Sequence, residues 1–187
     1  MHIKFTTGDV APALSIMREA AQWQIDLDTP LWLMETLTRE MITNPPDEFH
    51  VAWLEPNLDS TQRSSAYADM TGGNGAPPQA AACLLLSYHD PVFWPEIPAG
   101  TSGFLHKIAV RRKFAGHGIV AQLIAHAEQN CLARGITTMR LDTDINRPKL
   151  CALYKSLGYL QVGRRTMIIP EKNFEPFEVA LFEKELS

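Results

Sequence analysis

Two apolar runs of strand length lie close together near the middle of the chain, and they constrain the fold more than any other feature. The first is Ala80 to Tyr88 (AAACLLLSY) and the second is Phe104 to Val110 (FLHKIAV). A strand that is apolar on both faces has to be covered on both sides, usually by helices. The chain therefore favours a layered α/β structure in which a sheet lies between helices.

The C-terminal half adds two helices and three strands to these runs. Apolar residues at helical spacing predict a helix that starts near Ile119 and stops at Gly135, and a second helix over 147–157 that ends at Gly158. Segments 137–142, 159–168 and 178–184 are predicted strands, and the last two are expected to form an antiparallel pair.

The N-terminal part is predicted to contribute two strands and two helices. Residues 2–6 and 49–55 are the strands. Thr7 is predicted to cap a first helix that ends between Trp23 and Asp28. Pro30 is predicted to open a second helix, which carries Leu31, Met34, Leu37 and Met41 on one face and is closed by Asn44-Pro45-Pro46.

Segment 56–78 is polar, rich in glycine and serine, and has no convincing period. A stretch of this kind within a compact domain is usually a functional lid or a flexible insertion, and we expect an insertion here. Too little chain precedes it to form a separate domain. We therefore expect residues 1–187 to form a single domain.

Charge and composition exclude several classes of function. The chain has 17 basic and 21 acidic residues and a net charge of −4, so we do not expect a nucleic-acid partner. No leader and no bilayer-spanning run is expected. Three cysteines without a CxxC pair and six histidines without ligand spacing argue against a disulfide framework and a metal site. These features predict a cytoplasmic protein with a small substrate, and they leave a homodimer open.

A glycine-bearing turn joins the second apolar run to the helix at 119. The N–H groups in the first turn of a helix lack an intrahelical acceptor and carry partial positive charge, so this place can bind an anion. Gly116 and Gly118 leave room for a phosphate, and the basic run 111–113 raises the positive potential. Two glycines can also simply make the turn.

The order of these motifs resembles the GCN5-related N-acetyltransferase family, which moves an acyl group from acyl-coenzyme A to an amine. Its first signature is an apolar strand ending in an LAV-like triplet, a basic turn and [QR]xxGx[GA] at a helix start. Residues 108–110 (IAV) and 115–120 (AGHGIV) occupy these places, and they depart from the pattern at Ala115 and Val120.

The family's second signature resembles RLDTDINRPKLCALYKSLGY at 140–159. The resemblance implies that Asn146 helps to hold the pantetheine arm and that Tyr154 protonates the leaving thiolate. It also implies the family fold, a mixed and mostly antiparallel sheet with a splayed parallel strand pair and helices on both faces. The implied binding residues for acetyl-CoA are Ile108, Ala109, Val110, Ala115, Gly116, His117, Gly118, Ile119, Val120, Asn146 and Tyr154.

Acyl transfer to an amine needs a base, because an ammonium has no lone pair. His106 is the best candidate, and strand alternation predicts that it shares a face with Phe104, Ile108 and Val110. The segment LHKIAV resembles LHxLAV of the arylalkylamine N-acetyltransferases, in which the matching histidine serves in deprotonation. The rival bases in the preceding loop are His89, Asp90 and Glu96.

The acceptor pocket in this family is usually built from the first two helices and the loop before residue 104. Weak candidates for substrate contact are Trp23, Trp32, His89, Asp90, Trp94 and Glu96. The sequence thus predicts an acetyl-CoA-dependent N-acetyltransferase acting on a small primary amine by direct transfer. The alternatives are a non-catalytic acyl-CoA-binding or regulatory module and an acetyltransferase acting on a protein amine.

Overall fold

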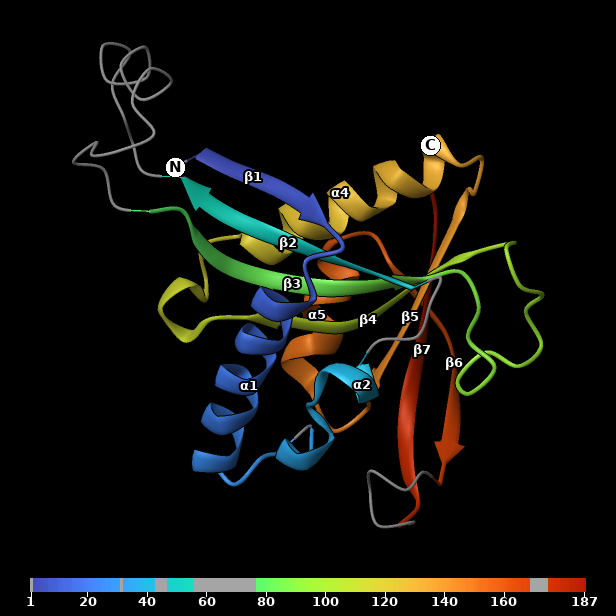
Figure 1. The fold of residues 1–187 in the computed structure, drawn as a ribbon. Coiled ribbons are helices and arrows are strands. Elements are labelled where there is room, and N and C mark those ends of the chain that lie inside the picture. Colours follow the sequence, from blue (N-terminus) through green and yellow to red (C-terminus); the bar gives the residue numbers. More distant parts are fainter. Residues whose placement is uncertain (1, 31, 43–46, 56–76, 169–174) are drawn as a thin grey trace.

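The protein is described by a computed structural model that covers residues 2–30, 32–42, 47–55, 77–168 and 175–187 (Figure 1). Nearly all of the predicted insertion at 56–78 lies outside these residues. Within them, no helix is long and apolar enough to cross a membrane.

One sheet organises the described part of the chain. Its strands follow the order β1-β2-β3-β4-β5-β7-β6, and every described pair is antiparallel except β4 with β5. This confirms the predicted mixed, mostly antiparallel sheet. The strands are β1 (His2–Thr7), β2 (Glu48–Glu55), β3 (Gln79–Ser87), β4 (Gly103–Val110), β5 (Thr138–Asp144), β6 (Leu160–Met167) and β7 (Phe177–Glu185). The α-helices are α1 (Val10–Asp26), α2 (Arg39–Ile42), α4 (Ile119–Ala133) and α5 (Pro148–Ser156), and short 3₁₀ turns cover Met34–Thr36 and Arg112–Phe114.

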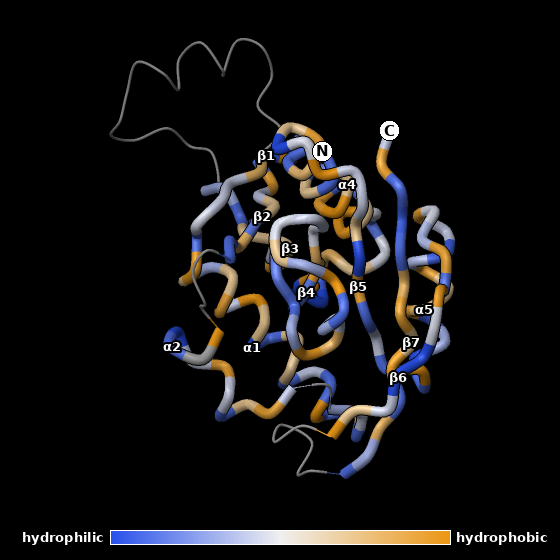
Figure 2. Tube along the Cα trace, turned by 90° about the vertical axis from the view of Figure 1, so that its right-hand side faces the viewer, coloured by the Kyte–Doolittle hydropathy of each residue, from blue (hydrophilic) through white to orange (hydrophobic). Residues whose placement is uncertain are grey.

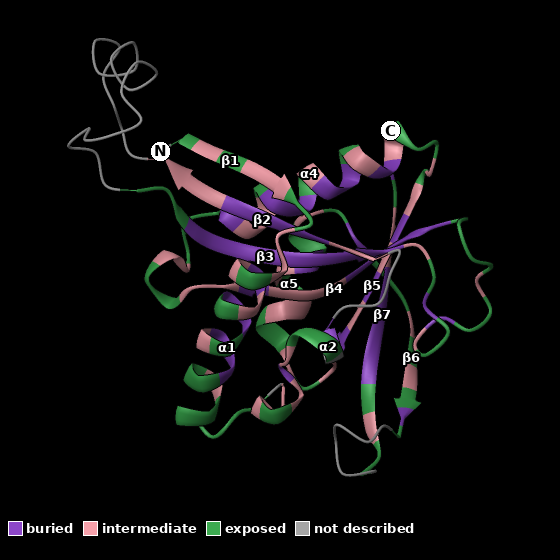
Figure 3. Ribbon diagram, viewed as in Figure 1, coloured by how far each residue is buried: buried purple, intermediate pink, exposed green. Residues whose placement is uncertain are grey.

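Helices cover both faces of the sheet, as predicted. α1 and α2 lie on one side, and α4 and α5 lie on the other (Figures 1 and 2). The α1 side packs Ile16 and Met17 against Cys83, Leu85 and other residues of β2 to β4. The α4 side buries a larger cluster of apolar residues from β3, β4, β5 and β7. β3 is therefore buried along nearly its whole length (Figure 3), as its apolar sequence predicts.

The start of the chain differs from the prediction at two points. Asp9, and not Thr7, precedes the first turn of α1, because Thr7 is still paired in β1 with His50 of β2. The predicted second helix is also wrong, since it is reduced to a 3₁₀ turn and the four-residue α2. Leu37 interrupts it with a non-helical backbone, and its carbonyl accepts a hydrogen bond from the Nε of Arg18 on α1 at 2.9 Å.

The first residue of β4 brings α4 close to the parallel strand pair. A Cβ at Gly103 would lie 2.5 Å from Cys131 Sγ on α4 and 2.8 Å from Met139 Sδ on β5. We expect Gly103→Ala to lower the free energy of unfolding by about 1–3 kcal/mol, because the core would be overpacked. Gly163→Ala is the matched strand control, since its nearest contact would be an ordinary 3.7 Å. Equal denaturant midpoints for the two variants would contradict this reading.

Candidate active site

The parallel strands β4 and β5 separate part of the way along their length. They pair only through Gly103–Leu105 and Met139–Leu141. Beyond these residues β4 continues beside β3 as far as Val110, and β5 continues beside β7 as far as Asp144. Beyond residues 105 and 141 the facing edges of the two strands are therefore unpaired, and this unpaired stretch is called the opening below. The backbone of β4 there is available to pair with an extended ligand.

A bulge lies on β4 at the point where the strands separate. Leu85 of β3 pairs with His106 and Cys83 pairs with Ala109, so β4 has one extra residue between the two pairs. Lys107 occupies this place with a φ of 50°. The extra residue reverses the alternation of side chains beyond it.

The bulge corrects the predicted orientation of the β4 side chains. Ile108 and Val110 pack with Leu105 on the α4 side, while Ala109 joins the core on the α1 side. His106 therefore does not share a face with Ile108 and Val110. Strand alternation gave the wrong orientation because Lys107 adopts a positive φ, which its residue type does not predict.

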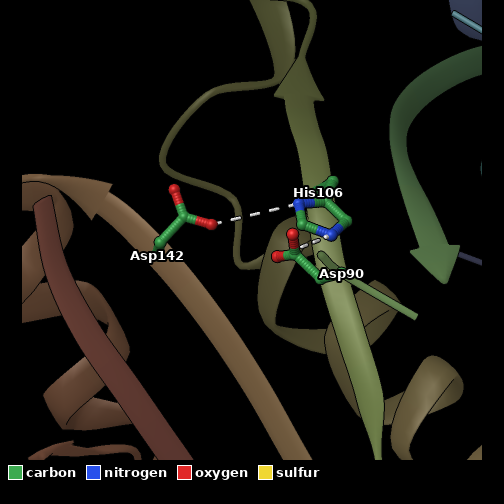
Figure 4. A group of neighbouring side chains, drawn as sticks. All are labelled: Asp90, His106 and Asp142. Carbon is green, nitrogen blue, oxygen red and sulfur yellow. Dashed lines mark ion pairs between the residues drawn. The ribbon is translucent and has the colours of Figure 1, made fainter. Parts of the chain in front are cut away.

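His106 lies between two carboxylates at the start of the opening. Its Nε2 is 3.6 Å from Asp90 Oδ2, and its Nδ1 is 4.0 Å from Asp142 Oδ1 (Figure 4). Nε2 thus faces Asp90 in the loop after β3, and Nδ1 faces Asp142 on β5. All three side chains are largely buried.

The loop after β3 fixes Asp90 firmly. Its Oδ1 accepts hydrogen bonds from the backbone N–H groups of Val92 at 3.1 Å and Phe93 at 2.9 Å. An aspartate followed by a proline is well suited to this turn, because the carboxylate satisfies the N–H groups that the turn leaves open. Asp90 is only 4% exposed, and its Oδ2 has no hydrogen-bond partner among the described residues.

Burial dominates the electrostatics of this group. Desolvation, together with the nearby charge of Asp90, raises the pKa of Asp142 to about 7, although a backbone hydrogen bond and the charge of Lys107 oppose the shift. Desolvation lowers the pKa of His106 although the charge of Asp90 opposes that change. Near neutral pH the imidazole is therefore uncharged and able to accept a proton.

The glycine turn at 115–118 opens α4 next to the basic run. Gly116 and Gly118 have φ values of 80° and 70°, and a Cβ on either would meet nothing within 4 Å. The turn thus combines a glycine-dependent backbone with open space beside both glycines, immediately before the first N–H groups of α4. Val120 packs against the core, and Ile119 is buried, so neither side chain fills that space. His117 is exposed, and its Nδ1 lies 3.1 Å from the Ala115 carbonyl oxygen.

The basic residues before this turn have separate partners. Arg111 pairs with Glu19 of α1, and its Nε donates to the Ala80 carbonyl at 2.8 Å. Arg112 lies 4.7 Å from the ring centroid of Trp23, and Lys113 donates to Gln79 Oε1 at 2.6 Å. Arg111 therefore ties β4 to α1, whereas the exposed Arg112 and Lys113 remain near the helix start.

Asn146 and Tyr154 lie at the β5–α5 side of the opening. The Asn146 N–H donates to Asp144 Oδ1 at 2.9 Å. Asn146 is exposed and borders a hollow of about 320 Å³ whose other lining comes from Ile145, from Thr166 of β6 and from 176–178 at the start of β7, on the side of β5 away from β4. Tyr154 is 6% exposed and packs against the rings of Tyr159 and Phe182. Burial raises the pKa of Tyr154, and the charge of Asp142 adds to the increase, so the phenol keeps its proton.

The remaining predicted contact residues are dispersed. Glu96 receives both of its hydrogen bonds from Arg165 Nη2, at 2.8 and 2.9 Å, and is therefore unsuited to act as a base. Trp94 is 3% exposed and packs on Phe104, so it anchors the loop. His89 is exposed, Trp23 is 38% exposed beneath Arg112, and Trp32 packs against the α1 core.

Sequence reasoning missed Asp142. The parallel register pairs Leu105 with Leu141, which brings the next residues on the two strands, His106 and Asp142, to the opening together. The available signal was an aspartate at the end of the predicted strand 137–142. Its meaning depends on a register that a single sequence does not supply.

Comparisons with known proteins bear on the family and the fold. The family model for the acetyltransferase (GNAT) family matches residues 30–159. An uncharacterized N-acetyltransferase, YesJ, from Bacillus subtilis (strain 168) is 33% identical over 87 residues, which are 45% of this chain and 48% of that protein. The match thus spans about half the length of this curated relative.

Solved structures share the fold at low sequence identity. An N-acetyltransferase from Staphylococcus aureus Mu50 has a TM-score of 0.65 at 15% identity, with full coverage of both chains. The ribosomal-protein-S18-alanine N-acetyltransferase of Escherichia coli has a TM-score of 0.61 at 16% identity and covers all of this chain and 95% of its own. A candidate streptothricin acetyltransferase from Bacillus anthracis str. Ames, in complex with acetyl coenzyme A, has a TM-score of 0.52 at 17% identity and covers 78% of this chain and 65% of its own.

Proposed function

Because the chain belongs to the acetyltransferase (GNAT) family, we propose that it transfers an acetyl group from acetyl-CoA to the primary amine of a small molecule. The observation that carries the proposal is the opening between β4 and β5 with His106 at its narrow end. An extended thioester can pair with β4 there and bring its carbonyl next to a neutral base.

The residues along the opening fit the parts of the donor. The glycine turn and the first N–H groups of α4 would hold the pyrophosphate, since main-chain donors and open space are both present. The backbone of Ile108 and Val110 would pair with the pantetheine arm, with Asn146 on the opposite side. A backbone N–H beyond the bulge would polarise the thioester carbonyl.

The reaction follows from these positions. His106 takes a proton from the bound ammonium, and the freed nitrogen attacks the thioester carbon. The tetrahedral intermediate collapses with cleavage of the carbon–sulfur bond, and the Tyr154 hydroxyl donates a proton to the departing thiolate. The second proton that the attacking nitrogen loses restores the Tyr154 hydroxyl, and His106 releases its proton to solvent. Overall, an ammonium and a thioester become an amide, a thiol and one released proton.

Two of the three cysteines are poorly suited to form an acyl-enzyme, which favours direct transfer. Cys83 and Cys131 are buried, and desolvation raises the pKa of Cys83 to about 12 and of Cys131 to about 11. A thiolate nucleophile is scarce under those conditions. Direct attack by the amine therefore needs fewer unfavourable steps.

Calorimetric titration with acetyl-CoA tests the donor site. We expect micromolar binding by the wild type and about tenfold weaker binding by Gly118→Ala, because a side chain at φ 70° disturbs the turn that presents the N–H groups. Gly135→Ala is the matched control, since Gly135 has a φ of 76° and equally open surroundings at the other end of α4. Its affinity should equal that of the wild type.

Two outcomes would count against the proposal. No binding by a folded wild type would mean that the fold has lost its coenzyme. Acetyl-CoA binding without turnover of any amine would favour a non-catalytic coenzyme-binding module. Acetylation of a peptide N-terminus, but of none of a broad panel of small amines, would favour an acetyltransferase that acts on a protein amine.

A further inference from the structure

Asp142 has no role in the reaction as derived above, although it faces the proposed base. Its Oδ1 lies 4.0 Å from His106 Nδ1, across the opening between β4 and β5 (Figure 4). The two atoms are too far apart for a direct hydrogen bond. They are close enough to share one small polar atom between them.

Asp90 determines which nitrogen of His106 is available. Asp90 Oδ1 is occupied by two backbone N–H groups, whereas its buried Oδ2 lacks a hydrogen-bond partner among the described residues and faces Nε2 at 3.6 Å. A buried carboxylate oxygen is strongly stabilised by a donor. The proton of the neutral imidazole is therefore favoured on Nε2, which leaves the lone pair of Nδ1 directed to the side of Asp142.

The distance between Nδ1 and Oδ1 suits an ammonium nitrogen that bridges the two atoms. A nitrogen about 2.9 Å from each acceptor would span 4.0 Å with an angle of roughly 90° at the nitrogen, within reach of two N–H bonds of one tetrahedral group. We propose that Asp142 Oδ1 and His106 Nδ1 together bind the acceptor as a protonated aliphatic primary amine, with Asp142 as its charge partner. This inference rests on the proposed function and defines its substrate class.

The charge balance of the opening agrees with a cationic occupant. Asp142 and Asp90 face the group from β5 and the loop, Lys107 comes from the bulge, and Tyr154 lies on the α5 side. Burial without a full counter-charge raises the pKa of Asp142 to about 7. An alkylammonium would supply that counter-charge, whereas an arylamine or an alcohol, which is neutral at pH 8, would not.

The test uses a simple probe, propylammonium chloride, and the ¹³C carboxyl signal of Asp142 in the full-length protein. At pH 8 we expect propylammonium to bind saturably. When the carboxyl signal is followed over a range of pH, we expect the apparent pKa of Asp142 to be at least one unit lower with propylammonium than without it. Tetramethylammonium, which has the charge but no N–H group, and propanol should each leave the signal unchanged. No shift with propylammonium, or an equal shift with tetramethylammonium, would overturn the proposal.

Variants separate this role from the general charge of the region. Asp142→Asn should abolish propylammonium binding and leave the acetyl-CoA affinity unchanged. Asp47→Asn is the matched control, because Asp47 is a partly buried carboxyl whose pKa is raised mainly by burial and also responds to the charges of Lys107 and Asp90. Equal loss in both variants would assign the effect to bulk charge and contradict a specific site.

A kinetic arm applies to any amine that the protein acetylates. Asp142→Asn should raise its KM about thirtyfold with a smaller change in kcat. Failure of the proposed function would appear as absent acetyl-CoA binding. Failure of this inference alone would appear as normal acetyl-CoA binding and turnover with an unchanged KM in Asp142→Asn.

Discussion

Replacing His106 with glutamine is expected to lower kcat roughly 100- to 1,000-fold while the acetyl-CoA affinity changes less than twofold. Glutamine keeps a polar group of similar reach but cannot accept the ammonium proton, and loss of general base catalysis commonly has this magnitude. Rapid-quench turnover and calorimetry measure the two quantities. His89→Gln is the matched control, because His89 is an exposed histidine in the neighbouring loop. An unchanged kcat for His106→Gln would remove His106 from the mechanism.

The pH dependence separates the base from the group that binds the amine. The pKa of His106 is lowered, so its base form persists below neutral pH. Asp142 has a pKa raised to about 7, so its carboxylate is lost as the pH falls through 7. The wild-type kcat/KM should therefore decline below about pH 7. That decline should survive in His106→Gln and disappear in Asp142→Asn.

The sequence was sufficient for the elements whose pattern is local. Continuous apolar runs predicted β3 and β4 as buried strands, and both are covered by helices. The periodic segment after Gly118 predicted α4, which begins at Ile119. These predictions were successful because burial on both faces and helical periodicity each produce a pattern within a short stretch of sequence.

The candidate site was predictable only in part, because it depends on register. His106 was identified from its residue type. The prediction that it shares a face with Ile108 and Val110 was wrong, because Lys107 forms a bulge. Asp142 was missed, since its partnership with His106 arises from the parallel pairing of β4 with β5. Asp90 was named only as one of several loop candidates. Its distinction comes from two backbone hydrogen bonds that fix it beside the imidazole.

The second predicted helix failed for a similar reason. Its apolar spacing was helical, but Leu37 has a non-helical backbone and its carbonyl accepts a hydrogen bond from Arg18 on α1. Tertiary contacts of this kind, which a local pattern does not contain, can override helical spacing. The long-range partner of Arg111 was likewise not predictable from the local sequence. Arg111 pairs with Glu19 and so links β4 to α1, which weakens its expected role in attracting a phosphate.

Removal of the Tyr154 hydroxyl tests the last step of the reaction, in which the departing thiolate receives a proton. Tyr154→Phe keeps the ring that packs against Tyr159 and Phe182, so the free energy of unfolding and the acetyl-CoA affinity should hardly change. We expect kcat to fall roughly 10- to 100-fold, because the departing thiolate loses its proton donor. Single-turnover measurements at saturating donor and amine isolate this step.

Tyr159→Phe is the control that distinguishes chemistry from packing. The Tyr159 hydroxyl donates to Glu128 Oε1 at 2.9 Å in the core, and Lys184 also binds that carboxylate. Its loss should lower the free energy of unfolding by about 1 kcal/mol and leave kcat near the wild-type value, since Glu128 retains Lys184. Tyr154→Phe should show the reverse pattern. If both variants lose stability and neither loses kcat, Tyr154 serves the core alone, and the proton for the thiolate must come from water.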